Sequence, residues 1–188
     1  MVACSQLCQL PCYGGVLPIA ESVGSGSRRL ELTSLVTRLS LQNDATANQV
    51  LCLQREAYQV EAELIGYDRI PPLIETLSEL QARPEIFAGI WHDAKVVAAI
   101  AYDQIDTQTI CICRLMVHPT HFRKGLASTL LHFVENAHPT MTRWLVATGS
   151  NNPPALKLYQ SFGYHIIGET EVAPNVFVTQ LMKHINHR

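Results

Sequence analysis

The amino-acid sequence predicts an α/β fold in which helices flank a mostly antiparallel central sheet. Three observations lead to this prediction: an amphipathic helical pattern early in the chain, β-type segments joined by short turns over residues 86–117, and alternating helical and β-type segments thereafter. The chain has 188 residues and 47% of them are hydrophobic, which suits one domain with one buried core.

Residues 1–30 are interpreted as an N-terminal tail and residues 31–188 as the folded domain. The tail is rich in glycine and proline and shows no sustained periodicity. Both disorder and packing on the domain are compatible with this composition.

The first half of the domain is predicted to contain one strand and two helices. Residues 32–41 alternate loosely and include β-branched side chains, which favours a strand. The segment Asn43-Asp44-Ala45-Thr46 offers an N-cap for a helix whose apolar stripe runs to about Ala62, before a proline pair interrupts the pattern. Residues 73–81 form the second predicted helix.

Residues 86–117 are predicted to form an antiparallel meander. Its strands cover residues 86–91, 96–102 and 109–117, and short turns join them. Because residues 110–113 have few polar side chains, the third strand is expected to be buried on both faces.

The rest of the domain alternates between helix and strand. The predicted helices cover residues 125–136 and 154–162, and the predicted strands cover residues 143–148, 164–168 and 175–182. Asn151 or Asn152 is the expected N-cap of the second of these helices.

Composition and charge argue against several classes of protein. The formal net charge is −2, so neither nucleic acid nor a membrane is expected as a partner. Charged residues make up only 16% of the chain, against roughly 25% in soluble domains, which leaves a monomer and a homodimer both open. The six cysteines fit no common zinc or disulfide framework, and we interpret them as reduced thiols of a cytoplasmic protein.

Residues 117–128 have the chemistry of an anion-binding loop. A predicted strand leads into a loop with Arg123, Lys124 and Gly125, and this loop opens a helix. The first N–H groups of a helix have no partner inside it, and the helix dipole favours an anion beside them. Because Gly125 and Ala127 have little side-chain bulk, a phosphate can approach this backbone closely.

Two motifs in this order resemble those of the GNAT superfamily of N-acetyltransferases. Val117-His118-Pro119, followed by Phe122-Arg123-Lys124-Gly125-Leu126-Ala127, resembles motif A, which cradles the pyrophosphate of acetyl-CoA. Phe122 departs from the family pattern, which usually has Gln or Arg there. Residues 152–164 resemble motif B, and the whole resemblance covers roughly residues 32–183.

This resemblance implies a GNAT fold in which two central parallel strands, residues 109–117 and 143–148, splay apart and hold acetyl-CoA as co-substrate, without a metal. The residues implied to contact acetyl-CoA are Leu115, Met116, Val117, Phe122, Arg123, Lys124, Gly125, Leu126, Ala127, Ser128, Asn152 and Tyr159. Tyr159 is also the implied catalytic residue, as a general acid for the leaving thiolate. The alternative roles are a packed tyrosine for Tyr159 and a helix N-cap for Asn152.

The acceptor amine must lose a proton before it attacks the thioester, and several groups are candidates for accepting it. Neither predicted central strand contains a carboxylate. Asp103, His118 and His121 are the nearest titratable residues, and a chain of waters is the alternative. A metal site on His118 and His121 lacks a third ligand, so no metal is predicted.

Residues 55–74 and 167–178 are expected to set the choice of acceptor. The acidic residues of the first region either attract a cationic amine or form a solvated helix face, and we favour the solvated face for Glu56, Glu61, Glu63 and Asp68. The predicted function is N-acetylation of a small amine or a protein amino group. The alternatives are a catalytically weak acyl-CoA-binding regulatory module and transfer of a longer acyl group.

Overall fold

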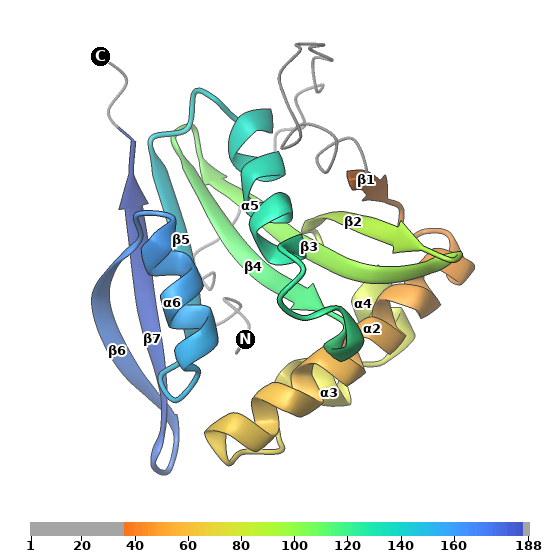
Figure 1. Ribbon diagram of the computed structural model, residues 1–188, viewed down its shortest axis with the longest axis horizontal. Helices are drawn as coiled ribbons and strands as arrows, with labels where there is room; N and C mark the ends of the chain where they lie inside the picture. The colour runs from red at the N-terminus through yellow and green to blue at the C-terminus, as the bar shows by residue number, and fades with distance from the viewer. Residues whose placement is uncertain (1–35, 186–188) are drawn as a thin grey trace.

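The computed structural model describes residues 36–185, which form one seven-stranded sheet with helices on both faces (Figure 1). The strands lie in the order β1-β2-β3-β4-β5-β7-β6. The strands are β1 (Val36–Leu39), β2 (Ile86–His92), β3 (Lys95–Asp106), β4 (Thr109–Val117), β5 (Arg143–Gly149), β6 (His165–Ala173) and β7 (Val176–His184). The helices are α2 (Asp44–Ile65), α3 (Pro71–Ile74), α4 (Leu77–Gln81), the 3₁₀ helix η2 (Pro119–His121), α5 (Leu126–Ala137) and α6 (Pro153–Ser161).

Each face of the sheet has its own hydrophobic core. On one face, Cys111 of β4 belongs to a buried cluster with Tyr58 of α2 and with residues of α4. On the other face, Ile112 of β4 belongs to a cluster with Leu130 of α5 and with residues of α6. The burial of all side chains over residues 110–113 confirms that β4 is covered on both sides.

The sheet is mixed because β4 and β5 run parallel, whereas all other neighbouring strands run antiparallel. The parallel ladder begins at Thr109 and Arg143 and ends at Ile112 and Val146. Beyond that point the two strands diverge toward the loops that precede α5 and α6 (Figure 1). These features confirm the predicted fold class, including two splayed parallel strands at the centre.

A β-bulge in β4 lies at the point where the two strands separate. Ile112 pairs with Tyr102 of β3 and Arg114 pairs with Ala101, so Cys113 is left without a register partner in β3. Because the extra residue of a bulge bends its strand, it turns the second half of β4 away from β5.

The N-cap of α2 lies in the predicted segment, whereas the predicted end of this helix is about three residues too early. The side chain of Asn43 caps α2, as its Oδ1 accepts a hydrogen bond from the Thr46 N–H at 3.0 Å. Helix α2 continues past Ala62 to Ile65, because the residue that ends it is Gly66, whose φ of 68° only glycine adopts readily. The closing strands β6 and β7 form a hairpin that is longer than predicted.

The single helix predicted for residues 73–81 is wrong. The structure has two short helices there, α3 and α4, separated at Glu75 and Thr76. Thr76 begins α4 through a capping box with Glu79: each side chain accepts a hydrogen bond from the other residue's backbone N–H, at 3.3 Å and 2.7 Å. The break allows Glu75 to point into the interior, where it meets the strands.

Some expectations fall outside residues 36–185. These are the predicted N-terminal tail, Cys4, Cys8, Cys12 and the first residues of the strand predicted over residues 32–41. Cys52 and Cys113 are free thiols, whereas Cys111 is disulfide-bonded, so the interpretation of all six cysteines as reduced is wrong for Cys111. None of the helices within the described residues has the length and apolar character of a membrane span.

Candidate active site

A cleft of about 600 Å³ opens beside the second half of β4, beyond the point where β4 leaves β5. Its walls come from α2, the end of β4, the loop and first turn of α5, and the first two turns of α6. The structure brings most residues predicted to contact acetyl-CoA to this one cleft. They are Leu115, Met116, Val117, Phe122, Arg123, Gly125, Leu126, Ala127, Ser128 and Asn152, whereas Lys124 and Tyr159 do not line it.

The first turn of α5 has N–H groups that form no hydrogen bond within the helix. Gly125 is the N-cap of α5, and no side chain caps this helix. The N–H groups of Leu126, Ala127 and Ser128 therefore have no helical partner, because the first helical bond is donated by the Thr129 N–H to the Gly125 carbonyl at 3.0 Å. This arrangement is suited to an anion at the wall of the cleft.

Backbone conformation explains the glycine at position 125. A Cβ added there would meet no atom within 4 Å, but the φ of Gly125 is +81°. Arg123 also has a positive φ, 61°, and a non-glycine residue in this region carries a strain of about 1 kcal/mol. The glycine is thus required by the turn rather than by lack of space.

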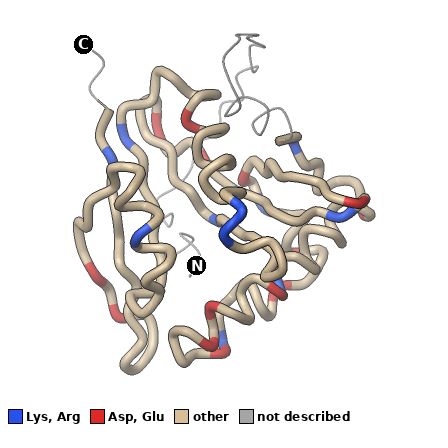
Figure 2. The backbone as a smooth tube through the Cα atoms, in the orientation of Figure 1, with Lys and Arg blue, Asp and Glu red and all other residues tan. Residues whose placement is uncertain are grey.

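Charges of opposite sign lie on two walls of the cleft. Figure 2 shows basic residues at the start of α5 and acidic residues along α2. Arg123 and Glu61 belong to these two groups, and both line the cleft. The loop side is suited to an anion, whereas the α2 side is suited to a cation.

The two motif-B residues occupy different environments. Asn152 caps α6, since its Oδ1 accepts a hydrogen bond from the Ala155 N–H at 3.2 Å, and it also lines the cleft. Tyr159 is fully buried and packs edge-on against Tyr164, with ring centroids 5.6 Å apart. Burial raises the pKa of Tyr159 well above its usual value, and the neighbouring Tyr164 and Tyr58 raise it further.

The three titratable candidates for the base are placed unequally. The His118 Nδ1 accepts a hydrogen bond from the Thr120 N–H at 3.2 Å, and its Nε2 lies 2.5 Å from Glu56 Oε2, so both ring nitrogens are engaged. Neither His118 nor Asp103 lines the cleft. His121 does, and partial desolvation and the nearby charge of Lys124 lower its pKa. Within residues 36–185, no cluster of three or more histidine, cysteine or acidic side chains is arranged to hold a metal.

Glu61 is the residue that the sequence analysis misplaced. It was assigned to a solvated face of the helix, but only 5% of Glu61 is exposed and it lines the cleft. The assignment holds for Glu56, Glu63 and Asp68, which are exposed. A signal was available, because Glu61 follows buried Tyr58 by three positions and therefore shares its helix face.

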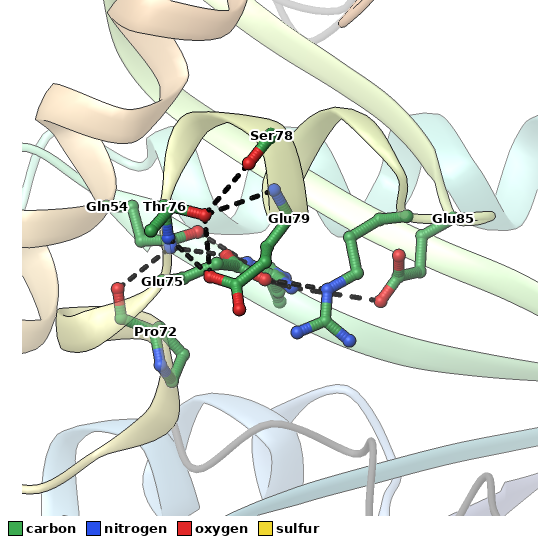
Figure 3. Close-up of polar contacts among 9 residues, drawn as sticks. Gln54, Pro72, Glu75, Thr76, Ser78, Glu79 and Glu85 are labelled. Atoms are coloured by element: carbon green, nitrogen blue, oxygen red, sulfur yellow. Dashed lines mark hydrogen bonds and ion pairs between the residues drawn. The ribbon is translucent and has the colours of Figure 1, made fainter.

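A buried ion-pair network joins β4 to the segment between α3 and α4 (Figure 3). Arg114, 2% exposed in its side chain, donates from Nη1 to Glu75 Oε2 at 2.6 Å and from Nη2 to Glu75 Oε1 at 3.1 Å. Gln54 donates to the same carboxylate at 2.8 Å and accepts from Arg114 at 2.5 Å. Arg83 adds a third donor to Glu75 at 2.6 Å. Because Arg114 directly follows the bulge residue Cys113, the network fixes the part of β4 that lines the cleft.

Because of this network, the free energy of unfolding is expected to fall when Glu75 is protonated at low pH. Burial opposes ionisation of Glu75, but the hydrogen bonds and charge of Arg114, with those of Gln54 and Arg83, lower its pKa to about 2. Since its ordinary pKa is 4.5, the ionised form stabilises the fold fully above about pH 4.5, and this is lost as the pH falls toward 2. We expect roughly 3 kcal/mol of unfolding free energy to be lost over that window. Urea denaturation of wild type and Glu75→Gln between pH 6 and 2 measures it, and an equal slope in both would contradict the assignment.

The sequence of the chain matches that of a known protein family over the segment that forms the cleft. The sequence profile described as the acetyltransferase (GNAT) family matches residues 47–164. The matched part runs from α2 to the end of α6 and contains every element that lines the cleft.

Two bacterial proteins are similar to the chain in sequence. The UPF0157 protein YqkA of Bacillus subtilis (strain 168) is 40% identical over 118 residues, which are 63% of this chain and 34% of YqkA. The chain thus spans about a third of the length of that relative. The uncharacterized N-acetyltransferase YsnE of the same organism is 29% identical over 126 residues, 65% of this chain and 82% of YsnE.

The fold is also shared with solved structures. The PaiA N-acetyltransferase of Thermoplasma acidophilum, solved in complex with coenzyme A, has a TM-score of 0.63 to this chain. The similarity covers 80% of this chain and 98% of that protein, at 16% sequence identity. At that identity the likeness concerns the fold alone.

Proposed function

The chain belongs to the acetyltransferase (GNAT) family, and on that premise we propose that it transfers an acetyl group from acetyl-CoA to a primary amine, on a small molecule or a protein, by direct attack. The observation that carries the proposal is the continuity of the cleft from the uncapped first turn of α5 to the free edge of β4. A cytoplasmic location, as a monomer or a homodimer, is part of the same proposal.

The residues at the α5 end of the cleft fit the pyrophosphate of acetyl-CoA. Backbone N–H groups of residues 126–128 lack helical partners and line the cleft together with Arg123. Phe122, which is 45% exposed, lines the same wall without contributing charge. The backbone amides and the helix dipole therefore account for most of the anion binding that we propose.

The end of β4 fits the pantetheine arm and the thioester. One edge of β4 pairs with β3 as far as Val117, whereas the other edge loses β5 after Ile112. The freed backbone groups of Leu115, Met116 and Val117 are thus available to bond the arm and to stabilise negative charge on the thioester oxygen. Acetyl-CoA supplies the activated carbonyl carbon that the amine attacks.

Tyr159→Phe is expected to lower kcat about 10- to 100-fold while the Kd for acetyl-CoA changes little. Burial and the neighbouring tyrosines raise the pKa of Tyr159 well above its usual value, so its hydroxyl is the protonated group that we propose as general acid for the leaving thiolate. The rate should accordingly show no alkaline fall between pH 7 and 10. Steady-state kinetics and calorimetry measure this, with Tyr164→Phe as a matched loss of a buried hydroxyl. An unchanged kcat would remove Tyr159 from the mechanism.

A catalytically weak acyl-CoA-binding module is the second candidate. Two observations favour it: Tyr159 does not line the cleft, and neither β4 nor β5 contains a carboxylate. Such a module would share the acetyl-CoA site and lack turnover.

Calorimetric titration with acetyl-CoA, together with thiol release in the presence of a panel of amines, tests the proposal. Binding with turnover of at least one amine supports the enzyme. Binding without turnover on any amine supports the module, and absence of binding contradicts both.

A further inference from the structure

We infer that Glu61 binds the ammonium group of the acceptor and removes its proton, and that the acceptor is a primary amine with one positive charge on an apolar carrier. This inference rests on the proposed function and adds the missing base and the class of substrate. It depends on where Glu61 lies, on what surrounds it and on what the reaction requires.

Glu61 reaches from α2 to the end of β5, across the opening between the splayed strands. The clearest measure is at Gly149, the last residue of β5. A Cβ added to Gly149 would lie 3.5 Å from Glu61 Oε1 and 2.7 Å from Ile65 Cγ2. A side chain at position 149 would collide with Ile65. The glycine therefore allows the Glu61 carboxylate to lie beside β5. Glu61 and Leu115 line the same cleft, so Glu61 and the freed edge of β4 border one cavity.

Glu61 supplies the only carboxylate among those of residues 36–185 that line the cleft. His121 is the other side chain there able to accept a proton near neutral pH, but it belongs to η2, on the loop side of the cleft where the pyrophosphate is proposed to bind. The positive charges of that side, Arg123 and Lys124, disfavour an ammonium group beside His121. A cationic acceptor is therefore directed to the α2 side.

The surroundings of Glu61 restrict the acceptor to an apolar carrier. The α2 side of the cleft is otherwise formed by Ala57, Tyr58, Val60 and Leu64. Leu64 is 47% exposed and gives this side of the cleft an apolar surface open to solvent. One ammonium group would be neutralised by Glu61, whereas a second positive charge on the carrier would find no second carboxylate among the described residues that line the cleft.

The proposed step conserves protons and electron pairs. The Glu61 carboxylate takes one proton from R–NH₃⁺ and leaves R–NH₂, whose lone pair forms the N–C bond to the thioester carbonyl. The C–S bond then breaks and its electron pair leaves with sulfur. The nitrogen loses a second proton and the thiolate gains one, so the products are the amide, free thiol and one net proton, which Glu61 returns to solvent.

The test compares Glu61→Gln with Glu63→Gln, which makes the same chemical change two residues away at an exposed position. With an alkylamine or arylalkylamine at pH 7, Glu61→Gln is expected to lower kcat/KM at least about 100-fold, the usual contribution of a general base. With hydroxylamine, whose nitrogen is already unprotonated at pH 7, the loss should stay below about 10-fold. Glu63→Gln should match wild type with both acceptors.

Two further measurements complete the test. The Kd of acetyl-CoA, measured by calorimetry, should be the same in Glu61→Gln and wild type. A monoamine should exceed the diamine of equal chain length in kcat/KM by about 10-fold or more in wild type. Equal losses with the alkylamine and hydroxylamine, no loss with either, or a preference for the diamine would overturn the inference and leave the proposed function intact. Absence of turnover by wild type on every amine would overturn the proposed function itself.

Discussion

Ala127→Glu is expected to raise the Kd of acetyl-CoA by about 100-fold or more, which corresponds to roughly 2.7 kcal/mol of binding free energy. Ala127 lies in the uncapped first turn of α5 and lines the cleft. A carboxylate there would occupy the N–H groups proposed for the pyrophosphate and repel the phosphates. Isothermal titration with acetyl-CoA measures the effect directly and does not depend on turnover.

The melting temperature of this variant distinguishes loss of affinity from unfolding. An acidic side chain in the first turn stabilises a helix by about 0.3–1 kcal/mol, so the melting temperature should stay the same or rise. Ala127→Gln, which adds the same volume without the charge, should weaken binding by only about 10-fold. Equal Kd values for the two variants would show that the anion does not bind at this turn.

The uncapped turn at the start of α5 was predictable because its signals are local. A loop with two cations and a glycine before a leucine-rich helix leaves backbone N–H groups without helical partners, wherever the helix lies in the fold, and their binding of the pyrophosphate is what we propose. Asn43 and Asn152 were predictable as caps for the same reason. In each case the interacting groups lie within a few residues of one another in the sequence.

Glu61 could not be assigned in this way, because its environment is made by segments distant in sequence. An acidic residue on an amphipathic helix usually faces solvent, and three neighbouring acids do so here. The wall that buries Glu61 includes Gly149 of β5 and residues of β4, far along the chain. The helical spacing from Tyr58 was the one local sign of an inward position.

The break between α3 and α4 has a similar origin. Residues 73–81 have a helical pattern, but Glu75 is 39 positions from Arg114, with which it pairs. The hydrogen-bonded pairing of these two charges outweighs the weak helical propensity of a few residues. The same pair lies beside the β4 bulge, so it joins the segment that precedes α4 to the strand that lines the cleft.

Arg114→Met is expected to lower the free energy of unfolding by about 3–5 kcal/mol, the range for removal of one partner of a buried ion pair. The loss leaves the Glu75 carboxylate buried with only Gln54 and the partly exposed Arg83 as donors. For a chain of this length the melting temperature should fall by roughly 6–20 °C. Urea denaturation at pH 7 measures the change.

The double variant Glu75→Leu/Arg114→Met distinguishes the effect of an unpaired buried charge from the effect of losing the contacts that hold the end of β4. Replacing both partners with apolar side chains removes the uncompensated charge at position 75, whereas Glu85, 3.9 Å from Arg114 Nη2, keeps its carboxylate, so about half of the lost stability should return. The Kd of acetyl-CoA should nevertheless stay weakened by about 10-fold, because Leu115, Met116 and Val117 follow Arg114 directly and lose the contacts that fix the end of β4. A double variant that recovers stability and affinity together would show that the bulge keeps its shape without the ion pair. One that recovers neither would show that hydrogen bonding at Gln54, rather than the charge pair, holds α2 to β4.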